Sequence, residues 1–319
     1  MKSPLSKPRR IAIVALLLVV LTIGFVVIRT NRFIMAYFTC KNGNTLADQG
    51  NYSDAIADYS KAIAADPTYA PAYCNRGIAL YMLGKPQEAI ADFTKTITLD
   101  PSNAPAYNNR GLALDKQGKQ QESIAEYAKA IEIDPTYALA YYNRGIALAN
   151  LHRNEVAIVD YTRAIGLDPQ SARAYNNRGV AFDDLGKHPE AIADLKHAIS
   201  IKPDYPNAHI NLAFVFFCGG ETKECLAELN IADGYGFADE YKFSLSFLRL
   251  LATNKIGKDT KRLESEFANW LGGVSFNRQK GFEAVEKWLA NYNLDAETTA
   301  IANGLIEKFR AKAPTEDGR

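Results

Sequence analysis

The feature that most constrains this chain is a pattern that recurs every 34 residues between residues 36 and 205. Five prolines keep that interval, namely Pro67, Pro101, Pro135, Pro169 and Pro203. The tripeptide Asn-Arg-Gly recurs in step with them, beginning at residues 75, 109, 143 and 177. A fixed period of this length is typical of a solenoid, in which each repeat buries its apolar face against its neighbours.

Small residues recur in pairs within the same pattern. Twelve residues separate the members of each pair: Gly43 and Ala55, Gly77 and Ala89, Gly111 and Ser123, Gly145 and Ala157, Gly179 and Ala191. Two helices cross closely only where neither carries a bulky side chain. We therefore expect each repeat to be a hairpin of two helices in contact at its small pair.

These residues resemble the tetratricopeptide repeat (TPR) family, in units 36–69, 70–103, 104–137, 138–171 and 172–205. The family pattern also has a glycine in the turn and an aromatic residue in the second helix. The matches are Gly50, Gly84, Gly118 and Gly186, then Tyr59, Phe93, Tyr127 and Tyr161. His152 and Leu195 depart from it. The resemblance implies an all-α, right-handed superhelical solenoid; the pentatricopeptide family, which usually repeats at 35 residues without an Asp-Pro ending, fits less well.

The pattern weakens after Tyr205. Residues 206–239 form a degenerate sixth repeat that lacks the closing proline, and the repeat at the end of a solenoid needs a cap. Apolar periodicity predicts helices over 241–251, 259–271, 281–291 and 296–311. We therefore expect 240–311 to be a helical cap or docking module, and 312–319 to be a disordered tail.

The N-terminus predicts a membrane anchor. Residues 1–10 are short and basic, and residues 11–28 are uncharged and apolar. Eighteen helical residues span about 27 Å, close to the ~30 Å hydrocarbon core of a bilayer. A cleavable signal peptide is the alternative, but bulky and basic residues follow the run. Four basic residues precede it and only Arg29 and Arg32 closely follow, which favours an inside N-terminus and an extracytoplasmic repeat domain, periplasmic in a bacterium.

No proline or glycine lies between Arg29 and Ala36. The membrane helix is therefore expected to continue into the first helix of repeat one as a stiff stalk.

Composition argues against several functional classes. The 37 Lys and Arg residues balance the 36 Asp and Glu residues, so no basic excess points to nucleic acid. The four histidines and four cysteines lack metal-ligand spacing. No phosphate loop, nucleophile elbow or dinucleotide fingerprint occurs. We expect no catalytic residue, metal, cofactor or small-molecule substrate.

Asparagine occupies the sixth position of the first helix in five consecutive units, at Asn75, Asn109, Asn143, Asn177 and Asn211. Asparagine is a poor helix former in an interior position. The resemblance implies that this position faces a concave groove, where a carboxamide offers a donor and an acceptor to a peptide backbone. Alternatively, each asparagine bonds a neighbouring repeat or water.

Arginine occupies the next position and is followed sixteen residues later by an acid. The predicted structural ion pairs are Arg76–Asp92, Arg110–Glu126, Arg144–Asp160 and Arg178–Asp194. The offset joins the two helices of one unit, and a partly buried arginine needs a carboxylate partner. An arginine array for phosphate or acidic peptides is the alternative.

Other predicted groove residues vary among the units. They are Asn108, Asn176, Tyr81, Tyr142, Asp115 and Asp183. The TPR clamp that grips acidic chaperone tails needs a lysine where this chain has Cys74, Asn108, Tyr142 and Asn176. The sequence therefore argues against that ligand.

Together these patterns predict a membrane-anchored scaffold or adaptor that binds extended segments of partner proteins. Two alternatives remain. One is an enzyme-associated subunit with activity in the C-terminal helices, and the other is a cytosol-facing receptor for polypeptides in transit. Fold alone does not decide among them.

Overall fold

The computed structural model describes residues 7–235, 239–255, 257, 260–261, 263 and 296–312, and its described residues contain helices and turns but no strand. The chain divides into two compact units, residues 1–151 and 152–319, and each is described by itself. The all-α helix-turn-helix architecture predicted from the period is confirmed in both.

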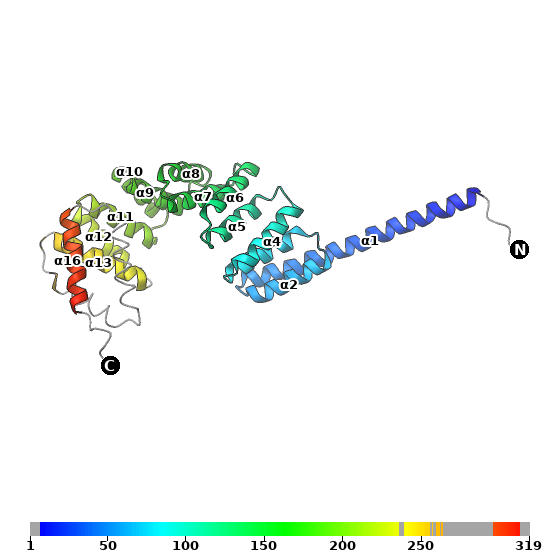
Figure 1. The fold of residues 1–319 in the computed structure, drawn as a ribbon, viewed down its shortest axis with the longest axis horizontal. Coiled ribbons are helices and arrows are strands. Elements are labelled where there is room, and N and C mark those ends of the chain that lie inside the picture. The colour runs from blue at the N-terminus through cyan, green and yellow to red at the C-terminus, as the bar shows by residue number, and fades with distance from the viewer. Residues whose placement is uncertain are drawn as a thin grey trace, which may run out of the picture. The chain divides into compact units, whose positions relative to one another are not determined.

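The first unit contains seven helices among its described residues (Figure 1). They are α1 Lys7–Asp48, α2 Tyr52–Ala65, α3 Ala70–Met82, α4 Pro86–Leu99, α5 Ala104–Asp115, α6 Gln120–Ile133 and α7 Ala138–Asn150. Helices α1 and α2, α3 and α4, and α5 and α6 pack as hairpins, and each hairpin packs on the next through α2–α3, α4–α5 and α6–α7.

The second unit continues the same pattern. Its described helices are α8 Asn154–Leu167, α9 Ala172–Asp184, α10 His188–Ile201, α11 Pro206–Cys218, α12 Thr222–Asp233, α13 Asp239–Lys255 and α16 Ala296–Lys312. A continuous apolar core joins α11, α12, α13 and α16 and includes Phe217, Leu229, Leu251 and Ile306. Helices α13 and α16 match two of the four predicted C-terminal helices. The predicted helices at 259–271 and 281–291 and the tail fall outside the described residues almost entirely.

Short turns end the first helix of each hairpin, and their backbone explains the recurring glycine. Gly50, Gly84, Gly118 and Gly186 have φ between +70° and +78°, where a Cβ would be strained. His152 replaces this glycine and still adopts a φ of 55°. The turn geometry is therefore kept at a position whose side chain disfavours it.

The glycine of each first helix allows a ring to pack against its backbone. A Cβ added at Gly43, Gly77 or Gly111 would lie 2.6–2.7 Å from the nearest ring atom of Tyr59, Phe93 or Tyr127, respectively. The predicted small pair is therefore only part of the contact, because the aromatic residue sixteen positions on fills the space above the glycine.

Helix α1 runs without a break through 42 residues, as the lack of a helix breaker after Arg29 predicted. The described side chains from Val20 to Ile28 are exposed, whereas Ala36 and Cys40 are buried against the first hairpin. The N-terminal half extends away from α2 (Figure 1). Residues 20–48 include a stretch long and apolar enough to cross a membrane.

Candidate peptide-binding groove

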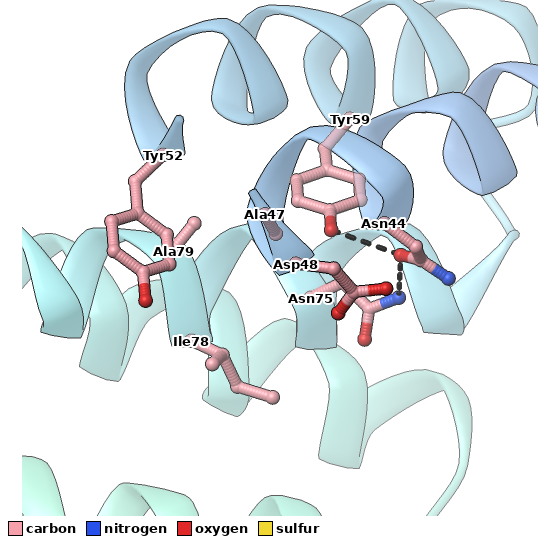
Figure 2. Close-up of a pocket in the computed structure, with 8 residues that line it drawn as sticks. All are labelled: Asn44, Ala47, Asp48, Tyr52, Tyr59, Asn75, Ile78 and Ala79. Atoms are coloured by element: carbon pink, nitrogen blue, oxygen red, sulfur yellow. Dashed lines mark hydrogen bonds between the residues drawn. The ribbon is translucent and has the colours of Figure 1, made fainter. Parts of the chain in front are cut away.

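A cavity of about 290 Å³ lies among the first three helices (Figure 2). Asn44, Ala47 and Asp48 line it from α1, Tyr52 and Tyr59 from α2, and Asn75, Ile78 and Ala79 from α3. Asn75 is the first of the five predicted ladder asparagines. The side chain of Ile78 is 40% exposed beside it, so the cavity combines polar groups with an accessible apolar surface.

Two hydrogen bonds fix the orientation of the carboxamides in this cavity. The Tyr59 hydroxyl donates to Asn44 Oδ1 over 2.9 Å, and Asn75 Nδ2 donates to the same oxygen over 2.8 Å (Figure 2). Burial, with smaller contributions from Cys40 and Asp48, raises the pKa of Tyr59 to about 12, so its hydroxyl stays protonated and acts as a donor.

This orientation leaves three polar groups without a hydrogen-bond partner among the described residues. They are the Nδ2 of Asn44, the Oδ1 of Asn75 and the exposed carboxylate of Asp48. One is a donor and two are acceptors. The cavity therefore offers both kinds of partner that a peptide backbone requires.

Two other ladder asparagines are bonded between repeats. Asn143 Nδ2 donates to Asn108 Oδ1 over 2.8 Å, and Asn211 Nδ2 donates to Asn176 Oδ1 over 2.9 Å. Asn108 and Asn176 are only 0% and 4% exposed, and Asn143 is 6% exposed. These burials contradict the prediction that Asn108, Asn176 and Asn143 lie on an open groove surface. Their carboxamides hold neighbouring helices together instead.

Asn109 differs from Asn143. It is half-buried, and its Oδ1 accepts a 3.3 Å bond from Asn108 Nδ2, while its own Nδ2 has no partner among the described residues. Asn177 Oδ1 accepts a corresponding 3.0 Å bond from Asn176 Nδ2, and the residue also has another interaction. Asn75 and Asn109 are therefore the ladder residues of the first unit with polar atoms available to a ligand.

The predicted acidic groove residues make internal bonds. Asp115 accepts from the Ser123 hydroxyl and, over 2.6 Å, from the Tyr127 hydroxyl. Asp183 lies 2.8 Å from Nδ1 of His188, and burial raises the pKa of this aspartate. Both carboxylates therefore fix the end of their hairpin. Tyr81 and Tyr142 are half-buried, and their stacking on a ligand stays a prediction.

The constant spacing between arginine and acid produces ion pairs in three of the repeats. The N–O distances are 2.8 Å for Arg76–Asp92, 2.7 Å for Arg110–Glu126 and 2.6 Å for Arg178–Asp194. Arg144 and Asp160 belong to one repeat but lie on either side of the boundary between the two compact units, and their pairing stays a prediction.

Each of these three arginines also reaches the preceding hairpin. The second hydrogen-bond partners are Ser60, Thr94 and Thr162, at 3.0–3.2 Å. The guanidinium groups of Arg76, Arg110 and Arg178 also lie 5.5–5.7 Å from the ring centroids of Tyr73, Tyr107 and Tyr175. Their donors are thus directed into the solenoid, which favours the structural interpretation over an anion-binding array.

Sequence reasoning missed most of the residues that line the cavity, among them Asn44, Asp48, Tyr52 and Ile78. Asn44 and Asp48 are four residues apart and lie on one face of α1. They occupy the ninth and thirteenth positions of repeat one, and repeat one lacks the Asn-Arg-Gly signature that drew attention to the other units. Comparing the same helix face across all the units would have found them. Among the described residues, no cluster of three potential metal ligands occurs.

Comparison with known sequences identifies the repeats. One model described as TPR repeat matches residues 43–84, 114–151 and 181–218, and three models described as tetratricopeptide repeat match 70–103, 93–125 and 138–171. Together they cover more than half of the chain. No curated protein sequence matches it significantly.

Similar solved structures support the fold. PilW, described as a widely conserved type IV pilus biogenesis factor, is 20% identical with a TM-score of 0.61, over 66% of this chain and 98% of its own. The pilF protein of Pseudomonas aeruginosa is 18% identical with a TM-score of 0.57, over 69% and 98%. MamA is 29% identical over 50% and 94%, with a TM-score of 0.47. The likeness to PilW and to the pilF protein extends to architecture only.

Proposed function

Because this chain belongs to the tetratricopeptide repeat family, we propose that it is a membrane-anchored adaptor that holds an extended segment of a partner protein. The observation that carries the proposal is the cavity among α1, α2 and α3. There Asn44 and Asn75 orient each other and leave a donor and an acceptor for a ligand. A carboxamide recognises a peptide backbone without regard to its side chains.

The same cavity supports a preference for one kind of side chain. Ile78 offers an apolar contact at one wall, and the unpaired carboxylate of Asp48 attracts a cation. A segment with a basic residue next to an apolar one satisfies both. Each hydrogen bond contributes only about 1 kcal/mol net, so we expect weak binding that strengthens when Asn109 and further units engage the same segment.

Helix α1 supports the anchoring part of the proposal. Its described side chains from Val20 to Ile28 are exposed, and the helix continues into the first hairpin without a linker. The excess of basic residues before residue 11 favours an N-terminus inside and a repeat domain outside the cytoplasm. Reporter enzymes fused after residue 35 test the sidedness. Reporter activity confined to the cytoplasm would contradict the proposed orientation and favour a receptor for polypeptides in transit.

The adaptor role requires no catalysed reaction at the cavity. The groups in the cavity are carboxamides, a carboxylate and tyrosines, and they suit recognition better than bond cleavage. We therefore propose a non-enzymatic protein whose ligands are protein segments. A chain truncated after Asp239 tests the alternative that the C-terminal helices carry an activity, because an adaptor keeps its partners without them.

The deciding experiment is crosslinking in native membranes followed by identification of the captured proteins. The test variant is Asn44→Ala/Asn75→Ala, and we expect it to lose the partners bound by the wild type. The matched control is Gln87→Ala/Gln117→Ala, because these exposed carboxamides also bond adjacent hairpins, over 2.8 Å, but lie outside the cavity. Equal capture by both variants would overturn the assignment of recognition to this cavity.

A further inference from the structure

A second cavity, of about 470 Å³, lies where α1 passes the turn between α2 and α3. Val26, Arg29 and Phe33 line it from α1, and Asp66, Thr68 and Tyr69 line it from the turn. We propose that this cavity binds the headgroup of a membrane phospholipid of the phosphoethanolamine class, which carries a phosphate, a primary ammonium group and no further charge. The proposal rests on the membrane anchoring proposed above but is independent of the peptide groove.

The cavity lies at the depth of lipid headgroups. The apolar run of α1 ends at Ile28, and Phe33 lies five residues, or about 7.5 Å, further along the helix. The headgroup regions add roughly 5–8 Å to each side of the hydrocarbon core. Because the turn at Asp66–Tyr69 shares a cavity with Val26, Arg29 and Phe33, it lies at the same depth.

The cavity exists because repeat one has no repeat before it. In the next repeat, the position that corresponds to Phe33 is Pro67, which lies in the turn after α2, so the preceding hairpin takes the place that α1 alone occupies in repeat one. At the N-terminal end of the solenoid, only the N-terminal part of α1 among the described residues lies beside the turn of repeat one. A terminal repeat needs a cover for this edge, and at this depth the surrounding molecules are lipids.

The polar groups of the cavity carry charges of both signs. Arg29 is exposed, and its guanidinium has no partner among the described residues. Asp66 Oδ1 accepts bonds from the backbone nitrogen and the hydroxyl of Thr68, over 2.9 and 2.7 Å, while its Oδ2 has no such partner. Arg29 is therefore suited to a phosphate, and Asp66 Oδ2 to a hydrogen-bond donor with a positive charge.

Aromatic rings complete the wall. Phe33 and Tyr69 meet edge to face, with ring centroids 5.6 Å apart and an angle of 87° between the ring planes. Tyr37 and Phe38 are exposed just beyond them. Tyrosine and tryptophan are enriched where membrane proteins cross the interface. Val26 lies within the apolar run and would contact the first acyl carbons, whereas Phe33 lies further out, beside the headgroup.

The charge pattern distinguishes among common headgroups. A primary ammonium donates N–H bonds to a carboxylate, whereas a choline nitrogen has no hydrogen to donate. An anionic glycerol headgroup satisfies Arg29 but brings no cation to Asp66. The pair of Arg29 and Asp66 therefore favours phosphoethanolamine over both.

The experiment reconstitutes the full chain in bilayers of phosphatidylcholine, phosphatidylethanolamine and phosphatidylglycerol in equal parts. After gentle extraction, native mass spectrometry identifies the lipid that stays bound. We expect one phosphatidylethanolamine, retained about tenfold over phosphatidylcholine, because a hydrogen bond to a charged group is worth about one such factor. Arg29→Gln and Asp66→Asn are each expected to abolish this preference.

Matched controls exist for both variants. Arg32→Gln removes a charge three residues away that does not line the cavity. Asp100→Asn alters the same turn in the next repeat, where Asp100 accepts equivalent bonds from Ser102. Both controls are expected to keep the preference. Glycerophosphoethanolamine in solution serves as the competitor that distinguishes a membrane lipid from a soluble phosphate ester, because it lacks acyl chains and should not displace the lipid.

The outcomes separate the two proposals. A chain released from membranes by carbonate would overturn the anchor and, with it, the headgroup site. An anchored chain that retains the three lipids equally, or whose preference survives both Arg29→Gln and Asp66→Asn, would overturn the headgroup site alone. Preferred retention of phosphatidylglycerol, lost only in Arg29→Gln, would overturn the ammonium assignment.

Discussion

Replacing Gly111 by alanine tests the packing that joins the two helices of a repeat. The new Cβ would lie 2.6 Å from Cε1 of Tyr127 and 3.0 Å from its Cδ1 and Cζ. Tyr127 is fully buried and its hydroxyl is held by Asp115, so the ring has little freedom to move. Overpacking costs about 1–3 kcal/mol, and moving the ring weakens a bond worth ~1 kcal/mol. A gain of ~0.5–1 kcal/mol from helix propensity offsets part of this.

We therefore expect Gly111→Ala to lower the free energy of unfolding by roughly 1–3 kcal/mol. The assay is urea unfolding of the full chain in detergent, followed by far-UV circular dichroism, with variants compared at their midpoints because a solenoid need not unfold in one step. The control is Gly166→Ala in α8, where no atom lies within 4 Å of an added Cβ. It should be neutral or stabilise slightly, by up to ~1 kcal/mol.

A double-mutant cycle identifies the cause. Tyr127→Phe releases the ring from Asp115, so Gly111→Ala should be less damaging in that background, by up to ~1 kcal/mol. If Gly111→Ala were as harmless as Gly166→Ala, the close approach of ring and backbone would not determine stability here, and the packing argument would be refuted.

Three further predictions follow from single positions. His152→Gly should stabilise the chain by about 1 kcal/mol in the same urea assay, because a φ of 55° strains a residue with a Cβ; an unchanged midpoint would contradict this. Asn143→Ala should destabilise the chain by about 1–3 kcal/mol because it leaves the buried Asn108 Oδ1 without its hydrogen-bond donor. Asn75→Ala should change stability little, and equal losses of stability in the two variants would argue against different roles for the two asparagines. Burial raises the pKa of Asp183, so its carboxyl group binds a proton more tightly in the folded chain than in the unfolded chain. The wild type should therefore gain stability relative to Asp183→Asn as the pH falls from about 7 to about 4. Urea titrations at several pH values that gave a constant difference between the two proteins would contradict this.

The repeat was predictable from the sequence because its geometry demands particular residues at fixed intervals. Glycine is required where φ is positive and where a ring packs on the backbone, and proline ends the second helix. The same rule made His152 recognisable as a substitute, and the chain kept the turn conformation there. The ion pairs of Arg76, Arg110 and Arg178 also followed from a constant offset between complementary charges.

The cavity was less predictable because it depends on which partners are absent. Asn44 and Asp48 matter because no residue in the described part of the chain bonds Asn44 Nδ2 or the Asp48 carboxylate. A one-dimensional pattern does not state what lies across from a side chain. Asp115 shows the converse. Its position suggested a groove residue, but Ser123 and Tyr127 of the same hairpin occupy its carboxylate.

The asparagine ladder shows how one residue pattern produces two roles. The sixth-position amide of one repeat reaches the fifth position of the repeat before it. Where that position holds asparagine, at Asn108 and Asn176, the carboxamides of Asn143 and Asn211 are bonded between repeats. In repeat one the fifth position is Cys40, whose sulfur is a weak acceptor and lies 3.7 Å from Asn75 Nδ2. Asn75 Nδ2 therefore donates its stronger bond to the exposed Asn44.

The fifth position therefore controls whether the next asparagine is available to a ligand. Cys74→Asn is the direct test, because it would give Asn109 the same neighbour that Asn143 has. We expect this variant to gain stability through an additional inter-repeat bond of about 1 kcal/mol and to lose affinity for any segment that contacts Asn109. A gain in stability without a loss of binding would support the inter-repeat bond but would contradict a contact between Asn109 and the ligand.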